Sequence, residues 1–224
     1  MGTPKHDPTQ EQWQAYVAAF AHFNQSLWGG KLPTVILNFS RQAHTYGFFA
    51  PERWEHSSGT ATHELSINPS HMRDRAPAEV YSTLVHEMAH LWQTTFGKPG
   101  RRGYHNHEWG DEMERVGLMP SHTGSPGGKR VGTKMSHYII DGGAYARAFS
   151  SLPPAALLPW LCKPESASEG KGKGKSASTS RNKTKYTCPG CESNVWGKPG
   201  LNIVCGDCDR LYEAPEDEDE AQAA

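Results

Sequence analysis

The sequence of 224 residues predicts an α+β fold for the larger part of the chain, followed by a small cysteine-rich module. Helix-like and strand-like hydrophobic spacings alternate within about the first 120 residues, which indicates helices packed on a small sheet. Residues 164–183 contain no large apolar side chain, a composition typical of a flexible linker. Two Cys-x-x-Cys pairs follow this stretch and mark the second module.

The strongest helical signals lie in three segments. Residues 9–28 carry apolar side chains at helical spacing and end at two glycines. Residues 77–96 have a proline in the first turn and stop at Gly97. A shorter helix is expected within residues 105–118, where apolar side chains fall roughly on one face.

Three strands are predicted between the first two helices. Residues 34–39 are short, apolar and β-branched. Residues 46–56 and 62–70 are extended segments around a Ser-Ser-Gly turn, and we expect them to pair antiparallel. Pro51 must lie at a bulge or on an edge strand, because proline cannot donate a hydrogen bond to the sheet.

Residues 119–162 give a weaker signal. A short extended segment is expected at 136–143 and a short helix at 144–152. Several histidines here and near the N-terminus show no ligand spacing, and we interpret them as surface or core residues. They are His22, His44, His56, His63, His71, His122 and His137.

The stretch YSTLVHEMAHLWQ, residues 81–93, carries the clearest chemical signal. His86 and His90 project from the same helix face about one turn apart. Two imidazoles at this spacing can each give a nitrogen to a tetrahedral Zn²⁺ at roughly 2.0 to 2.1 Å. Glu87 can reach a water on the metal without being a ligand. The predicted chemistry is peptide hydrolysis, in which Glu87 takes a proton from water acidified by zinc.

The alternative is a core helix with ordinary buried histidines. The helix is apolar nearly all round, so the two histidines and Glu87 would be buried without partners unless a metal satisfied them. The metzincin spacing is excluded, because its glycine and histidine positions hold Gln93 and Phe96.

A third metal ligand is needed to complete the site. His105 ranks first, because it lies fifteen residues after His90, where the next helix would begin after a glycine-bearing loop. Glu108 or Glu112 would instead give a site of two histidines and one carboxylate. His107 stays open as another candidate.

The stretches LVHEMAH and GYHNHEW together resemble the SprT-like domain, the metalloprotease family that includes Spartan. The resemblance also covers FNQSLWGGKLP at 23–33 and HELSINP at 63–69, so it spans roughly residues 10–120. It implies a zincin fold of the minigluzincin type, with the zinc helix packed on a small sheet. It also implies a zinc-dependent endopeptidase that is stimulated by DNA and cuts proteins bound or crosslinked to it.

By position, the family pattern matches His105, Glu108 and Trp109, so the resemblance gives the role of third ligand to His105. One departure is that the glycine found directly after the third histidine in the family is Asn106 here. For this reason His107 remains a rival.

The C-terminal cysteines predict a second zinc site. Thirteen residues separate the two Cys-x-x-Cys pairs, a spacing typical of a zinc ribbon in which four thiolates close a tetrahedral site. This zinc would be structural, since it has no open position for water. Trp196 and Tyr212 are interpreted as core aromatics of the ribbon rather than stacking surfaces. The four ligands are Cys188, Cys191, Cys205 and Cys208.

These signals divide the chain into four parts. We expect a metalloprotease domain at 1–162, a flexible basic linker at 163–186, the ribbon at 187–213 and an acidic tail at 214–224. The stretch 163–185 carries seven Lys or Arg against two acids, a net charge of +5. Residues 213–220 carry six acids and no base, so this tail would repel DNA.

DNA is an expected partner besides protein substrates. Lys98, Arg101 and Arg102 lie on the loop between the two ligand-bearing helices, and with the basic linker they could neutralise phosphates of single-stranded or crosslinked DNA. The alternative function is a catalytically silent DNA-binding or regulatory zinc protein that acts through its ribbon. The sequence leaves the oligomeric state open.

The chain shows no signal peptide and no run of roughly 18 to 20 apolar residues that could span a bilayer. We therefore expect no membrane association and no secretion. The predicted location is the cytoplasm, with a nucleoid or nuclear association as the variant that DNA binding would favour.

Overall fold

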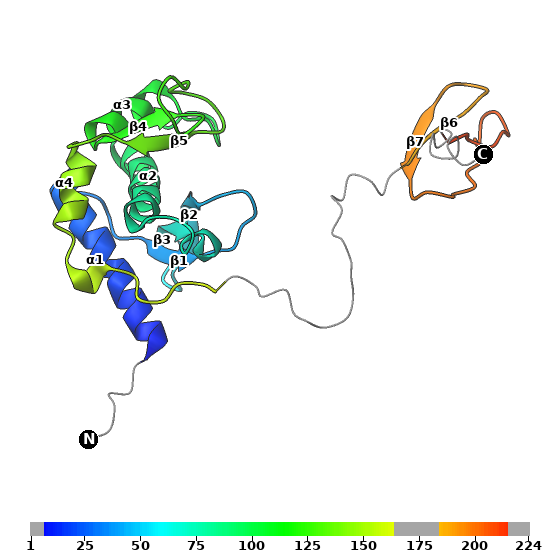
Figure 1. The fold of residues 1–224 in the computed structure, drawn as a ribbon. Coiled ribbons are helices and arrows are strands. Elements are labelled where there is room, and N and C mark those ends of the chain that lie inside the picture. Colours follow the sequence, from blue (N-terminus) through cyan, green and yellow to red (C-terminus); the bar gives the residue numbers. More distant parts are fainter. Residues whose placement is uncertain (1–6, 164–183, 215–224) are drawn as a thin grey trace, which may run out of the picture. The chain divides into compact units, whose positions relative to one another are not determined.

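The computed structural model describes residues 7–163 and 184–214. The chain divides into two compact units, Met1–Ser166 and Ala167–Ala224, which are taken separately below (Figure 1). Most of the predicted linker and acidic tail lies outside the described residues, so these predictions stay predictions. Among the described residues, no helix is long and apolar enough to cross a membrane.

A three-stranded sheet forms one layer of the larger unit, with the strand order β1-β3-β2. The strands are β1 (Ile36–Phe39), β2 (Gly47–Glu55) and β3 (Ala61–Ile67). The predicted antiparallel pairing of β2 with β3 is confirmed. Strand β1 pairs parallel with β3 on the other side, so β2 is an edge strand.

Strand β2 is interrupted by a bulge. Its register against β3 shifts between Ala50 and Trp54, and Pro51 lies within this interval as expected. Glu52 has a left-handed backbone with φ of 47°, and its amide donates a hydrogen bond to the His63 ring over 2.9 Å. The proline therefore falls where the sheet makes no ladder bond.

Helix α2 (Pro77–Phe96) lies at the centre of the larger unit and contacts β2 and β3 (Figure 1). Helix α1 (Pro8–Trp28) begins at the side chain of Asp7, which accepts hydrogen bonds from two backbone amides of the first turn. It ends at Gly29, whose left-handed backbone closes the last turn.

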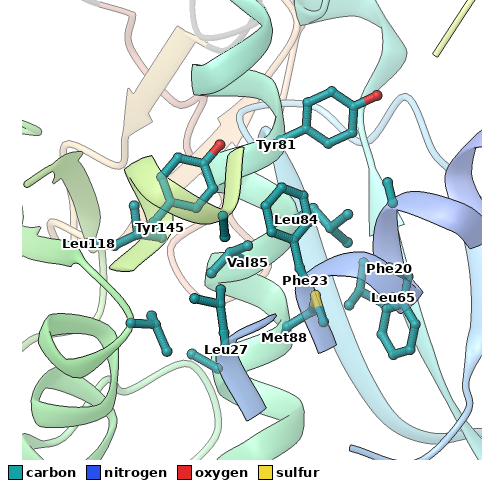
Figure 2. Close-up of a cluster of buried hydrophobic side chains, with 14 of the residues drawn as sticks. Phe20, Phe23, Leu27, Leu65, Tyr81, Leu84, Val85, Met88, Leu118 and Tyr145 are labelled. Carbon is teal, nitrogen blue, oxygen red and sulfur yellow. The ribbon is translucent and has the colours of Figure 1, made fainter. Parts of the chain in front are cut away.

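The core forms around α2. Leu84, Val85 and Met88 on this helix are fully buried. They lie among side chains from α1 and β3, with Phe23 and Leu65 close by (Figure 2). Full burial of a side chain of this size is worth about 1.5 to 3 kcal/mol. The packing holds α2, and hence its histidines, in a fixed position against the sheet.

A single 3₁₀ turn at Pro69–His71 precedes α2. The elements that follow α2 are α3 (His107–Arg115), β4 (Leu118–Ser121), β5 (Ser136–Ile139), α4 (Ala144–Ser150) and a 3₁₀ turn at Pro154–Ala156. The helix expected within 105–118 is shorter than predicted, and Leu118 begins a strand. Strands β4 and β5 pair antiparallel. Strand β4 was missed because it has only four residues and contains a proline.

The smaller unit is built on a hairpin of β6 (Thr184–Thr187) and β7 (Asn194–Gly197). Tyr186 is its buried aromatic, at 2% exposure, whereas Trp196 is 63% exposed. The interpretation of Trp196 as a core residue is therefore wrong. Side chains alternate across a strand, and Tyr186 lies opposite Val195, so its face is the buried one and Trp196 falls on the other.

The turn at Gly117 gives a test of how the β4–β5 hairpin is held. Gly117 has φ of +89°, and a Cβ there would meet the backbone nitrogens of Ala144 and Tyr145 at 2.7 Å. Gly29 has φ of +62° with open space around it. We expect Gly29→Ala to cost about 1 kcal/mol through its backbone alone and Gly117→Ala at least about twice as much.

The free energy of unfolding from urea denaturation compares these two variants directly. Gly29→Ala is the matched control, because it carries the same left-handed strain without a steric clash. Equal losses in the two variants would contradict the close packing of the turn against α4.

Candidate metal centre

The larger unit brings three histidines together. His86 and His90 come from consecutive turns of α2, and His105 lies two residues before α3. Each offers a ring nitrogen, and these three atoms lie within 4.8 Å of one another. Nitrogen atoms bound tetrahedrally at 2.0 to 2.1 Å are about 3.4 Å apart, so the arrangement is close to that of a zinc site.

The other candidate ligands are placed elsewhere. His107 is exposed at the start of α3. The Glu108 carboxylate accepts a hydrogen bond from the Lys98 amide over 2.7 Å and so secures the end of α2. The buried Glu112 carboxylate accepts one from Trp28 over 2.6 Å. Of these candidates, only His105 lies with the first two histidines.

Trp109 forms the wall of the cluster. It is fully buried on α3, and its ring centroid lies 4.9 Å from that of His86, 5.2 Å from His90 and 4.4 Å from His105. One rigid side chain thus packs against all three imidazoles. The loop from α2 to α3 brings both Trp109 and His105 to the cluster.

Two of the three histidines also form hydrogen bonds through Nδ1. The Nδ1 atom of His105 lies 3.1 Å from the carbonyl oxygen of Gly132. The Nδ1 atom of His86 lies 3.0 Å from Nδ1 of His137, which belongs to β5. His137 is a partly buried residue outside the group of three ligand nitrogens, in keeping with its interpretation as a surface or core residue, but the sequence did not indicate its contact with His86. No local pattern could have revealed it, because 51 residues separate the two histidines and only the β4–β5 hairpin brings them together.

The cluster is held in its neutral form. Burial is the main cause that lowers the pKa of His90 to about 3 and that of His137 to about 4. Burial also lowers the pKa of His86 and of His105. A neutral imidazole has a lone pair for a metal, so the environment favours the state that can bind one.

Glu87 lies beside the cluster without belonging to it. Only 6% of the residue is exposed, and burial raises the pKa of its carboxyl to about 8, against a smaller opposing effect of a backbone hydrogen bond from Phe49. A carboxyl with a pKa near neutrality can both take up and release a proton under ordinary conditions.

An open cleft of about 1400 Å³ exposes this site. The three histidines and Glu87 line it, together with residues 47–50 of β2 and loop residues 99–104. Arg101 and Arg102, two of the predicted DNA contacts, are exposed on its wall. Lys98 is exposed at the start of the same loop but is not among the lining residues.

The smaller unit brings the four predicted cysteines together. One sulfur from each lies within 4.8 Å of the others. The Sγ atoms of Cys191 and Cys205 are 3.7 Å apart, far longer than a disulfide bond of about 2.05 Å, and the cysteines are free thiols. Cys188 and Cys205 are buried, whereas Cys191 is exposed. Four sulfur ligands leave no open position on a tetrahedral metal.

The sequence pattern of the SprT-like family matches residues 17–135, which is more than half of the chain. The chain belongs to the SprT-like family. The match includes His86, His90 and His105 and ends two residues before His137. Membership indicates a domain of the zinc metalloprotease type. No curated protein matches the chain.

Both clusters fit zinc by the chemistry of their donors. Three neutral imidazoles beside a carboxylate in an open cleft match the ligand set of an accessible zinc site. Four clustered thiols match a closed structural site. His86, His90 and His105 would hold the first ion, and the four cysteines the second.

Metal analysis of the purified chain tests this assignment. We expect two zinc ions per chain, one for each cluster. Cys205→Ser should lower the content to about one, because a buried sulfur ligand is lost while the histidine cluster stays intact. A wild-type chain that retains one ion, or a variant that retains both, would contradict the assignment.

The metal-free chain should lose stability as the pH falls below about 6.5. In the unfolded chain the histidines take up protons near this pH, whereas His90 keeps a folded pKa of about 3. Its contribution to stability is therefore complete above the unfolded pKa and is lost as the pH falls toward the folded value. Below about pH 6.5, His90→Gln should reduce the pH dependence of the free energy of unfolding.

Urea denaturation in the presence of a chelator, between about pH 5 and pH 7.5, measures this difference. The same replacement at the exposed His56 is the matched control and should keep the wild-type slope. Identical slopes for wild type and His90→Gln would show that His90 is not kept neutral by the fold.

Proposed function

We propose that this chain is a zinc-dependent endopeptidase that is stimulated by DNA and acts on DNA-bound or DNA-crosslinked proteins. The observation that carries the proposal is the position of Glu87 beside three clustered histidines in an open cleft. Family membership supports the metalloprotease chemistry. The DNA-linked substrate rests on the resemblance to Spartan and on the charges around the cleft.

The residues of the site have distinct tasks in this proposal. A zinc ion held by His86, His90 and His105 would supply a Lewis acid that polarises a peptide carbonyl and acidifies water. Glu87 would take the proton from the attacking water and deliver it to the leaving amine. Burial raises the pKa of Glu87 to about 8, and a zinc ion beside it would favour the carboxylate that takes the proton.

The edge strand β2 supports a polypeptide as substrate. Residues 47–50 line the cleft beside Glu87, and among the strands of residues 7–163 and 184–214 β2 pairs only with β3. The free edge of a strand can pair with an extended peptide through backbone hydrogen bonds. A cleft of about 1400 Å³ is also larger than a typical small-molecule pocket of about 300 to 1,000 Å³.

The charge around the cleft supports a nearby DNA strand. Four exposed basic side chains line it, and the carboxylates in its lining, Glu64 and Glu87, are buried. Exposed cations can neutralise phosphates, a term that weakens steeply with salt. The four cations are Arg53, Arg101, Arg102 and Lys134.

One observation favours the alternative of a silent protein that acts through its ribbon. Trp196 is 63% exposed on β7, where its ring is available to stack on an unpaired base. Under this alternative, Trp196→Ala weakens DNA binding, and Glu87→Gln has no effect on any activity. The intact His86, Glu87 and His90 favour the protease.

Glu87→Gln tests the catalytic part of the proposal. Zinc-loaded chain is incubated with a DNA-binding protein, with and without single-stranded DNA, and cleavage is followed on gels. We expect the variant to lose cleavage by about 10² to 10⁴-fold, because it lacks the general base, and to keep both zinc ions. Cleavage by the variant at the wild-type rate would contradict the role of Glu87.

The double variant Arg101→Ala with Arg102→Ala tests the role of DNA. We expect a smaller stimulation of cleavage by DNA and unchanged cleavage without DNA, because these cations lie on the cleft wall and outside the histidine cluster. Arg147→Ala on α4 is the matched control, since this arginine is exposed but does not line the cleft. Equal stimulation of the wild type, the double variant and Arg147→Ala would show that this loop does not contact DNA.

A further inference from the structure

We propose that His137 and Ser82 are positioning residues that fix the ring tautomer of His86 and so turn its Nε2 lone pair toward the metal. The inference rests on the proposed role of His86 as a zinc ligand. It assigns a task to two residues that lie outside the ligand-bearing motifs. The evidence is a chain of hydrogen bonds whose directions can be worked out one by one.

The series of hydrogen bonds starts at a backbone carbonyl in the first turn of α2. The Ser82 hydroxyl donates to the carbonyl oxygen of Glu79 over 2.9 Å. A carbonyl can only accept, and a hydroxyl has a single proton. Ser82 has therefore used its proton, and its oxygen must accept from Nε2 of His137 at 2.8 Å.

This direction decides the next two steps. A neutral imidazole has one protonated and one unprotonated nitrogen. Because His137 is protonated on Nε2, its Nδ1 is an acceptor, and Nδ1 of His86 at 3.0 Å must be the donor. His86 is then protonated on Nδ1, which leaves the lone pair of Nε2 free for a metal.

The surroundings keep the direction from reversing. Arg75 also donates to the Glu79 carbonyl, over 2.6 Å, so this carbonyl accepts hydrogen bonds from both Ser82 and Arg75. His137 has one hydrogen-bond partner at each ring nitrogen, and donation through Nε2 with acceptance through Nδ1 matches a single tautomer of the ring.

A single hydrogen bond fixes the same tautomer in His105. Its Nδ1 lies 3.1 Å from the Gly132 carbonyl oxygen, which can only accept, so His105 is also protonated on Nδ1. A carbonyl fixes the tautomer by itself. A histidine partner does not, because it can donate or accept, and this is why His86 needs Ser82 behind His137. His137 itself is outside the group of three ligand nitrogens.

The tautomers can be measured without any metal. NMR of the full chain with ¹⁵N-labelled histidine, at neutral pH and with a chelator, distinguishes the two protonated nitrogens of each ring. We expect Nδ1–H for His86 and His105 and Nε2–H for His137. The signals are assigned with variants that each replace one histidine. Nε2–H on His86 or Nδ1–H on His137 would overturn the proposal.

Zinc affinity of the histidine cluster gives the second test. His137→Leu removes the acceptor for His86, and we expect a loss of about 10 to 100-fold, the usual effect of losing a hydrogen-bond partner of a metal ligand. His137→Gln offers an amide oxygen in its place and should retain most of the affinity. Similar losses in both variants, or none in His137→Leu, would overturn the proposal.

Ser82→Ala tests the other positioning residue. We expect weaker zinc binding and a mixed tautomer for His137, because its Nε2 loses the acceptor. Thr83→Val is the matched control, because the Thr83 hydroxyl also donates to the Glu79 carbonyl, over 3.3 Å, but accepts no hydrogen bond from His137. If Ser82→Ala and Thr83→Val have the same zinc affinity and the same His137 tautomer, Ser82 has no positioning role.

Cobalt(II) competition measures the two sites in one sample, because thiolate and imidazole ligands give different visible spectra. The four-cysteine site should keep its affinity in every variant and serves as the internal reference. Absence of metal from the histidine cluster of the wild type would overturn the proposed function. Metal binding that His137→Leu leaves unchanged would overturn only the positioning role.

Discussion

The structure of the larger unit depends on the burial of polar groups in one apolar helix. Helix α2 is covered on nearly every side, and this burial keeps the histidines neutral and raises the pKa of Glu87. Buried polar groups are costly unless they are paired. A metal on one side of the imidazoles and hydrogen bonds on the other would meet that requirement. The need for these partners explains why the loop after α2 and the hairpin after α3 both return to the same helix.

The two predicted zinc sites differ in whether water can reach the metal. The histidine cluster uses three ligands and opens into a cleft that is bounded by the edge strand β2. The cysteine cluster uses four ligands and would exclude water from its metal. The first arrangement suits chemistry on a bound substrate. The second suits a segment of about 30 residues that is too short to build a sufficient core of its own.

Distant elements control the fine geometry of the first site. His137 reaches His86 because β5 pairs with β4, and β4 begins directly after Gly117, whose left-handed turn packs against the start of α4. Trp109 packs against all three histidines because α3 contacts α2. Ligand position, ring orientation and tautomer therefore come from different parts of the fold.

The sequence by itself determined the pair His86 and His90 and the four-cysteine cluster, because helical pitch and the short Cys-x-x-Cys spacing place such ligands through local geometry. It also indicated three strands and a position for Pro51 at a bulge or on an edge strand. Only the tertiary structure decided that His105, rather than His107 or Glu108, lies with the first two histidines, that His137 contacts His86, and that Trp196 faces solvent. These outcomes depend on how loops fold back and which strand face is covered. Such contacts join residues far apart in the chain, and no local spacing encodes them.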